Sequence, residues 1–154
     1  TDALTRLGNR LAHDEAAERY AEHGSETGVL VNDLDHFKAV NDTHGHAVGD
    51  DVLRWLAVVL KGELRGDDGA FRLGGEEFVV LLPDASWSGA RAAAERLRQR
   101  IARQPVPTQA GELSVTASIG VSVWAPGSKL SSALAQADDA LYRAKRSGRD
   151  RVVG

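Results

Sequence analysis

Hydrophobic residues recur at three- and four-residue intervals in four segments, and this spacing predicts four helices. Leu4, Leu7 and Leu11 open the first segment, which runs from Leu4 to Tyr20. Apolar positions at this spacing form one face of an α-helix, and that face packs against the rest of the protein. The other three segments are Val52–Leu64, Ala90–Ile101 and Leu130–Ala144, the last of which is followed by Gly148 as a residue that ends the helix.

Other apolar segments have the length and pattern of β-strands. Val29–Val31 is short and wholly apolar, which is typical of a strand buried on both faces. Phe71 and the run Phe78–Leu82 flank Gly74-Gly75, so they are predicted to pair as a β-hairpin. Apolar and polar residues alternate with a period of two along Val115–Val123, which predicts a further strand.

The elements therefore follow the order helix, strand, helix, hairpin, helix, strand, helix, and Val152-Val153 is expected to add an edge strand. Without the first and last helices this order is βαββαβ, the split arrangement of ferredoxin-like folds. We predict an α+β fold, an α/β sandwich whose ferredoxin-like or palm core has an antiparallel central sheet with its helices on one face. Polymerase palms and nucleotidyl cyclases share this arrangement, so it does not by itself give the function.

The composition suits a single domain over residues 1–154, because 42% of the residues are hydrophobic and can form a core. The formal net charge of -3 argues against a nucleic-acid partner, since such domains usually carry a basic excess. The chain has no cysteine, which excludes disulfides, thiol catalysis and cysteine metal sites. No apolar run approaches the roughly 20 residues that span a bilayer, so we expect a cytoplasmic domain without membrane contact. Because the chain begins at Thr1 without Met, we expect a fused sensor domain in a longer parent protein, which could be membrane-anchored.

Two acidic pairs follow the first predicted strand and the hairpin turn. Asp33 and Asp35 come directly after the strand, and Glu76 and Glu77 follow the turn at Gly74-Gly75. If the strand neighbours the hairpin at the usual spacing of about 4.8 Å, a carboxylate from each pair can share one cation. Mg²⁺ is often held by one or two carboxylates together with substrate phosphates. Either pair alone is more typical of a solvated loop, but the two together favour a nucleotide–metal site.

Four motifs resemble the diguanylate cyclase family, also called the GGDEF or GGEEF family. Arg72–Phe78 (RLGGEEF) looks like its signature, Asp2–Arg10 like its opening helix, Asp33–Asp50 like its nucleotide-binding block and Ala140–Arg149 like its closing motif. The motifs occur in the family's order and cover nearly the whole chain. Arg6 stands where the family often has glycine, which we expect to affect only the entry helix. The resemblance implies that two GTP molecules are joined into cyclic di-GMP with loss of two pyrophosphates, in a homodimer because one site cannot place both reactants.

The resemblance also implies the catalytic and metal-binding residues. Asp33 and Glu76, with the backbone carbonyl of Leu34, would hold divalent metal ions, and Glu77 would help to hold a second one. We expect two Mg²⁺ or Mn²⁺ ions per active site. Glu76 is also the expected proton acceptor for the ribose 3′-hydroxyl. Lys38 would offset phosphate charge in the transition state.

Further residues match the family's substrate-binding positions, which are Asn41, His46, Asp50, Lys145 and Arg149. A carboxylate accepts from N1 and N2 of guanine while an amide addresses the remaining edge, so Asn41 and Asp50 favour GTP over ATP. Lys145 and Arg149 would grip the outer phosphates. Both also stand near the end of a predicted helix, where cations pair with the helix dipole, and the two roles are compatible.

A polar loop just before the signature resembles the family's RxxD inhibitory site, where the product cyclic di-GMP binds. Its residues are Arg65 and Asp68, and Arg96 matches a secondary arginine of that site. A guanidinium can bridge the Hoogsteen edge of guanine or a phosphate, and a carboxylate can accept from the Watson–Crick edge. Such a loop arises easily by chance, so its position relative to the signature carries the assignment. His44 has no role that we assign.

Two other functions stay open on the sequence. The first is a catalytically silent regulatory module that binds GTP or cyclic di-GMP, against which the intact Glu76 and Lys38 argue. The second is another nucleotidyl cyclase on a similar palm, against which the Asn41 and Asp50 pair argues. Turnover of GTP compared with ATP distinguishes all three functions.

Overall fold

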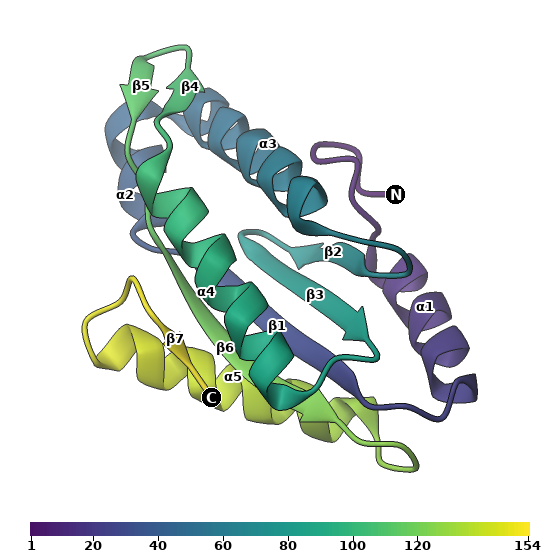
Figure 1. The fold of residues 1–154 in the computed structure, drawn as a ribbon. Helices are drawn as coiled ribbons and strands as arrows, with labels where there is room; N and C mark the ends of the chain where they lie inside the picture. The colour runs from purple at the N-terminus through teal and green to yellow at the C-terminus, as the bar shows by residue number, and fades with distance from the viewer.

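A five-stranded sheet in the order β2-β3-β1-β6-β7 forms the centre of the computed structural model, which describes residues 1–154 (Figure 1). β1 pairs antiparallel with both β3 and β6, while β7 pairs parallel with β6. Every residue of β1 is buried, as expected of an apolar central strand. The strands are β1 (Thr27–Leu34), β2 (Gly69–Gly74), β3 (Glu77–Pro83), β6 (Ala117–Trp124) and β7 (Val152–Val153).

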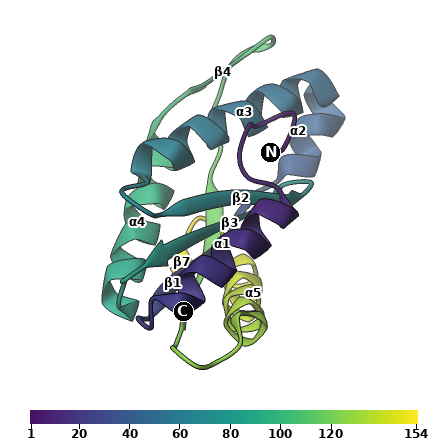
Figure 2. The same cartoon turned by 90° about the vertical axis from the view of Figure 1, so that its right-hand side faces the viewer.

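Helices cover both faces of this sheet (Figure 2). On one face, α3 (His46–Glu63) and α4 (Trp87–Arg103) enclose a core with inward-facing strand residues such as Phe78. On the other face, α1 (Arg10–Glu22) and α5 (Leu130–Arg146) pack on the alternate strand positions. The predicted βαββαβ core with its helices on one face is therefore confirmed, and the first and last helices cover the opposite face.

Three short elements were not expected from the sequence pattern. α2 (Phe37–His44) precedes α3, and Gly45 separates the two helices with a φ of 90°, a conformation that favours glycine. β4 (Val106–Thr108) and β5 (Gly111–Leu113) form a separate two-stranded sheet that packs against α3. No helix of the structure is both long and apolar enough to cross a bilayer.

The prediction that the first helix begins at Leu4 is wrong, because α1 begins only at Arg10. The side chain of Asn9 caps the helix by accepting from the backbone N–H of Ala12 at 3.0 Å. The preceding residues form a turn, in which the Asp2 carboxylate accepts from the backbone of Thr5 at 2.9 Å and from its hydroxyl at 2.7 Å.

The leucine spacing that suggested a helix has a different cause. Leu7 is buried and packs into the core from the turn, and the partly buried Leu4 packs against the same core. Arg6 lies between them with a φ of 63°, in the left-handed region that glycine enters most easily. Arg6 thus belongs to the turn and not to the entry helix, which gives a physical reason for glycine at this position.

Candidate active site

The signature residues form a tight turn between β2 and β3. Gly74 pairs with Glu77, so Gly75 and Glu76 are the two residues of the loop. Gly75 has a φ of 48°, as two-residue hairpin turns require of a glycine. The register shifts between Arg72 and Gly74, which marks an irregularity just before the turn. The sequence therefore presents Glu76 at the tip of a short hairpin.

The Arg72 side chain holds this turn in place through a hydrogen bond and an ion pair. Its Nε donates to the carbonyl of Gly75 at 2.8 Å, and its Nη1 lies 3.1 Å from Oδ2 of Asp2. Burial by itself would raise the pKa of Asp2, but hydrogen bonds from Thr5 and Arg72 lower it below its ordinary value. The N-terminal turn and the hairpin turn are therefore joined by one ion pair.

Asp33 and Glu76 lie close together, as the strand order predicts. Asp33 pairs with Glu77 across β1 and β3, which places it beside the hairpin turn. Burial raises the pKa of Glu76, the Asp33 carboxylate raises it further, and Lys145 opposes both effects. Oδ2 of Asp33 accepts a hydrogen bond from Nζ of Lys145, whereas the buried Oδ1 has no hydrogen-bond partner. A buried carboxylate oxygen without a donor is a vacant ligand position for a cation.

A cavity of about 410 Å³ opens beside Glu76, and the acids Asp35 and Asp42 also line it. Three cationic side chains surround it, which are those of Lys38 on α2, Lys145 at the end of α5 and Arg149 just beyond α5. Leu34 at the end of β1 and the first residues of α2 form another part of the cavity wall. The cavity lining therefore combines carboxylates with three cations, a combination that suits a metal-bound phosphate chain.

The residues present fit a hard divalent cation only if a ligand supplies further oxygens. No group of three or more His, Cys, Asp or Glu side chains is arranged to hold a metal ion. Asp33, Glu76 and the carbonyl of Leu34 are all oxygen donors, the type that Mg²⁺ and Mn²⁺ prefer. The unpartnered Oδ1 of Asp33 is the observation that favours a cation here.

Glu77 differs from its neighbour Glu76. It does not line the cavity, and its side chain is exposed at the start of β3. Burial first, then the carboxylates of Asp138 and Asp33, raise the pKa of Glu77, and Arg10 opposes them. The structure thus places Glu77 beside Asp33 but toward α5, away from the phosphate-sized cavity.

Three of the predicted substrate-binding residues lie around the junction of α2 and α3, outside the lining of the cavity, namely Asn41, His46 and Asp50. Oδ1 of Asn41 is buried and has no hydrogen-bond partner. A methyl group on Gly49 would come within 1.8 Å of this oxygen, so glycine is required for the Asn41 side chain to lie where it does. His46 is the exposed first residue of α3, and Asp50 follows Gly49 half-buried on the same helix.

Arg65 and Asp68 are brought together in the loop before β2. The Asp68 carboxylate accepts from the backbone N–H of Arg65 at 3.0 Å, and the Asp68 N–H donates to the Arg65 carbonyl at 2.9 Å. Burial raises the pKa of Asp68, which Arg65 partly opposes. The hydroxyl of Tyr20 donates to the carbonyl of Asp67, so α1 holds the loop from the other side.

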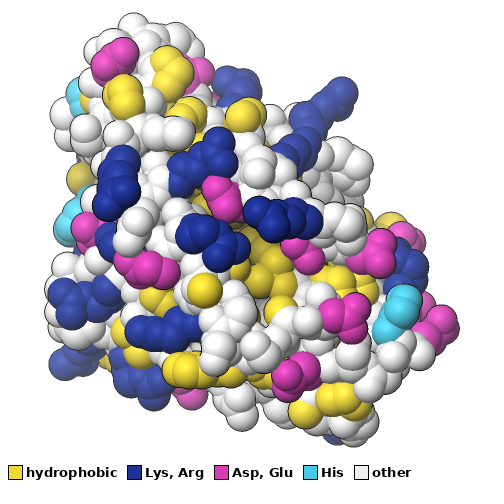
Figure 3. Space-filling view, in the orientation of Figure 1, with side chains coloured by type: hydrophobic (Ala, Val, Ile, Leu, Met, Phe, Trp, Pro, Cys, Tyr) yellow, Lys and Arg dark blue, Asp and Glu magenta, His cyan; other side chains and the backbone are white.

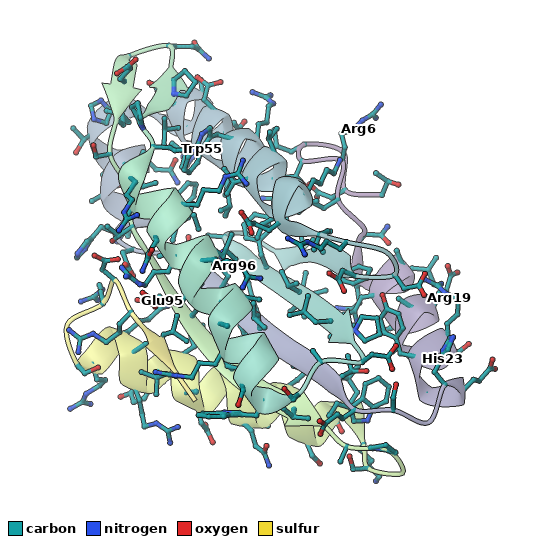
Figure 4. All side chains as sticks on the ribbon, in the orientation of Figure 1. Arg6, Arg19, His23, Trp55, Glu95 and Arg96 are labelled. Atoms are coloured by element: carbon teal, nitrogen blue, oxygen red, sulfur yellow. The ribbon has the colours of Figure 1, made fainter.

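Arg96 comes from a different element, α4, and makes no hydrogen bond or ion pair with this loop. Figure 3 shows Lys and Arg side chains gathered on the face that carries α4, and Figure 4 labels Arg96 on that helix. Several α4 arginines are already engaged: Arg98 pairs with Glu95, and Arg100 pairs with Glu63 at 2.7 Å. The exposed Arg96 remains available to an anionic ligand.

Comparison with known families identifies the chain. A family model described as diguanylate cyclase, GGDEF domain, matches residues 1–151. The chain belongs to this family. Its sequence is 44% identical over 156 residues to the diguanylate cyclase DgcP of Pseudomonas aeruginosa, an alignment that covers 99% of this chain and 23% of DgcP. It is 42% identical over 161 residues to the response regulator PleD of Caulobacter vibrioides, which covers all of this chain and 36% of PleD.

Solved GGDEF domains have the same fold. The GGDEF domain of DgcB from Caulobacter crescentus, in complex with c-di-GMP, superposes with a TM-score of 0.91 at 36% identity and covers 99% of this chain and 94% of that one. The diguanylate cyclase SiaD of Pseudomonas aeruginosa, in complex with its activator SiaC, superposes with a TM-score of 0.90 at 42% identity, covering 99% of this chain and 60% of SiaD. The chain thus spans well under half the length of DgcP and PleD.

The structure of this GGDEF domain also shows a residue whose role the sequence did not indicate. Asp35, the second acid after β1, is buried and accepts three hydrogen bonds from other parts of the chain. The Asp-Leu-Asp spacing suggested a pair of equivalent acids, but only Asp33 has a free oxygen. The alternation of apolar and polar residues along Val115–Val123 was the available signal, because Thr116 and Ser118 are polar positions of that segment and donate to Asp35.

Proposed function

We propose that this GGDEF domain condenses two GTP molecules into cyclic di-GMP and releases two pyrophosphates. The observation that carries the proposal is the buried, unpartnered Oδ1 of Asp33 beside Glu76, which lines a cavity with three cations. Family membership supports the same reaction, since relatives over the full length of this chain are named diguanylate cyclases.

In this reaction the 3′-oxygen of one GTP forms a bond to the α-phosphorus of the other, and the bond from that phosphorus to the β-phosphate bridging oxygen breaks. Glu76 accepts the proton of the 3′-hydroxyl, for which its raised pKa suits it, because a stronger base is a better proton acceptor. Pyrophosphate leaves with the bonding electron pair. A second, identical step closes the ring.

The cations of the cavity bind the charge of the triphosphate. Lys38 approaches from α2 and stabilises the negative charge that develops at the reacting phosphate. Lys145 and Arg149 bind the outer phosphates, and the pairing of Lys145 with Asp33 holds its ammonium in the cavity beforehand. A guanidinium can contact two phosphate oxygens at once, which suits Arg149 to a terminal phosphate.

Asp33, Glu76 and the Leu34 carbonyl would hold Mg²⁺ or Mn²⁺, with two ions per site and Glu77 contributing to the second. When bound, such an ion lowers the pKa of a nearby hydroxyl and stabilises charge on phosphate oxygens. Because the protein would supply few oxygens, water or the nucleotide would complete the coordination, so GTP should tighten metal binding.

Guanine is recognised at the α2–α3 junction. The unpartnered Oδ1 of Asn41 accepts from the base, and Asp50 accepts from N1 and N2. His46 supports this loop at the start of α3. ATP presents neither of these donors in the same places, so the site selects GTP.

Each domain holds one GTP, so catalysis needs two domains facing each other as a homodimer. A fused sensor in a longer cytoplasmic or membrane-anchored parent protein would bring two such domains together. The Arg65 and Asp68 loop, with Arg96, binds the product cyclic di-GMP and inhibits the enzyme.

The rival function is a silent module that binds GTP or cyclic di-GMP without turnover. The test is to incubate the domain with GTP and Mg²⁺ at rising protein concentration and to separate the products by chromatography. The proposal predicts two pyrophosphates for each cyclic di-GMP, a specific activity that rises with protein concentration, and no comparable product from ATP. Binding of GTP without any pyrophosphate, even at high protein concentration, would favour the silent module.

A further inference from the structure

Asp35 is a buried carboxylate with no cation paired to it. It is 5% exposed. Its Oδ1 accepts from the Ser118 hydroxyl at 2.6 Å, and its Oδ2 accepts from the Thr116 hydroxyl at 2.7 Å and from the backbone N–H of Asp150 at 3.0 Å. Burying a charge without an ion pair is unfavourable unless hydrogen bonds satisfy it, and here both oxygens are satisfied.

The two acids after β1 therefore have different tasks. Asp33 keeps one oxygen free and lies beside Lys145 and Glu76, both of which line the cavity. Asp35 has both oxygens engaged by the protein, and its own N–H donates to the carbonyl of Thr116 at 2.9 Å. Asp35 is thus held rigidly at the end of β1, two residues from Asp33.

The bond from Asp150 is the one that reaches the phosphate-binding segment. Arg149, which lines the cavity, directly precedes Asp150. Both residues have left-handed backbones, with φ values of 64° and 45°, although neither is glycine. Such conformations persist only where the surroundings hold them. The Arg149 N–H bonds to the carbonyl of Ala144 at 2.9 Å, and the Asp150 N–H bonds to Asp35.

We propose that Asp35 is a positioning residue for triphosphate binding, which ties the Arg149 loop to the end of β1. The Asp35 carboxylate fixes the position of Arg149, which binds the outer phosphates, relative to Asp33 and Leu34 at the end of β1. This inference rests on the proposed function, because it needs a triphosphate ligand. It assigns to Asp35 neither metal binding nor proton transfer.

A purely structural role is the alternative, and other contacts of the loop make the two separable. Asp150 also pairs through its carboxylate with Arg98 at 2.6 Å, so the loop does not depend on Asp35 alone for its attachment. Ser118→Ala removes the donor to Oδ1 of Asp35, the oxygen that does not bond to the loop. It is therefore the matched control for lost stability without lost positioning.

The test measures the affinity for α,β-methylene GTP, which cannot release pyrophosphate, in the presence of Mg²⁺. Asp35→Ala should weaken binding about tenfold, the effect expected when a buried hydrogen bond that orders a ligand residue is lost. Ser118→Ala should lower the melting temperature and leave the affinity unchanged. Asp35→Asn should retain most of the affinity, because its amide oxygen can accept from Asp150 while the Ser118 hydroxyl turns to accept from its NH₂.

A double-mutant cycle decides how Asp35 acts. If it acts through Arg149, then Asp35→Ala together with Arg149→Ala binds the analogue no more weakly than Arg149→Ala alone. Where Asp35→Ala fails to fold, Asp35→Ser takes its place, since a serine hydroxyl is too short to reach Asp150. If the double variant instead loses affinity by the product of the two single losses, Asp35 does not act through Arg149. That result would overturn the positioning role while leaving the proposed function intact. Absence of binding by the unmodified domain would instead contradict both.

Discussion

Nζ of Lys145 donates a hydrogen bond to Oδ2 of Asp33, the carboxylate whose other oxygen has no partner. These residues are 112 positions apart in the chain, and they meet because α5 packs along β1 and β6. The ammonium offsets the negative charge of Asp33. It also lowers the pKa of Glu76, against the effects of burial and of Asp33. Lys145 thus balances the charge of Asp33 through one carboxylate oxygen, while the other oxygen is free to accept a cation.

Replacing Lys145 should therefore make the domain depend more on added metal. In Lys145→Met, Asp33 and Glu76 repel each other without a nearby cation, so we expect the melting temperature without metal to fall by about 2–4 °C, the effect of about 1 kcal/mol in a domain of this size. Mg²⁺ should then raise the melting temperature by more than in the unmodified domain. Thermal melts in MgCl₂ and in NaCl of equal ionic strength measure this.

Lys129→Met is the control, because Lys129 is exposed just before α5 and has no hydrogen bond or ion pair from its side chain. It should respond to Mg²⁺ as the unmodified domain does. An equal Mg²⁺ response in Lys145→Met would contradict the vacant cation site at Asp33.

The raised pKa of Glu76 also predicts a pH-dependent effect on stability. A carboxyl group with a raised pKa in the folded state favours folding while protonated, and this contribution is lost as the pH rises through that pKa. Glu76→Gln cannot ionise, so it does not lose this stability at high pH. We expect this variant to melt about 1–2 °C higher than the unmodified domain at pH 7, after allowance for solvent screening, and to show no such gain at pH 4. The same gain at both pH values would indicate a cause other than ionisation.

Gly49 provides a test of guanine recognition. Gly49→Ala places a methyl group 1.8 Å from Oδ1 of Asn41, so the amide must move. We expect KM for GTP to rise about tenfold and the preference for GTP over ATP to fall, because a buried acceptor for the base is lost. Steady-state kinetics with both nucleotides check this prediction.

Gly62→Ala is a matched control on the same helix, since its methyl group would meet only the flexible end of Arg100, at 3.4 Å. Alanine is the better helix former, so this variant should be slightly more stable and should keep its KM. A change of KM in Gly62→Ala as large as that in Gly49→Ala would show that the effect comes from α3 in general.

Product inhibition should depend on Tyr20 as well as on the charged residues of the loop. Tyr20→Phe removes the hydroxyl that donates to the carbonyl of Asp67 and so loosens the loop that carries Arg65 and Asp68. We expect the concentration of cyclic di-GMP that gives half-inhibition to rise about fivefold, the effect of one lost buried hydrogen bond, with the uninhibited rate unchanged. Tyr142→Phe, whose exposed hydroxyl bonds only to Arg146, should leave inhibition unchanged. Unaltered inhibition in Tyr20→Phe would show that the bond from Tyr20 on α1 does not hold this loop for product binding.

Much of the fold followed from the sequence because long apolar stripes and strand runs leave few alternatives. The approach of Asp33 to Glu76 was predictable once β1 was placed beside the hairpin, and the register between β1 and β3 confirms it. The entry helix was predicted too long because Leu4 and Leu7 have helical spacing, yet the Asp2 carboxylate and the left-handed Arg6 hold a turn. Local spacing cannot distinguish a helix from a turn whose leucines reach the same core.

The site contacts that the sequence did not reveal are long-range hydrogen bonds. Asp35 accepts from Thr116 just before β6, from Ser118 on β6 and from the loop after α5, all more than 80 positions away in the chain. The short β4–β5 sheet was also missed, since three-residue strands carry no periodicity. Composition and spacing indicate which residues carry charge, but the partner of each charge is set only when the elements pack.

Glu76 has the central chemical task, and one comparison of rates tests it most directly. Formation of cyclic di-GMP from GTP and Mg²⁺ is measured for the unmodified domain, for Glu76→Gln and for Glu112→Gln, which removes an exposed glutamate on β5. The account predicts that Glu76→Gln lowers the rate at least about 100-fold, as expected when a proton acceptor is lost, and that Glu112→Gln leaves it unchanged. Retained synthesis in a folded Glu76→Gln domain would contradict the proposed role of Glu76 and, with it, the proposed mechanism.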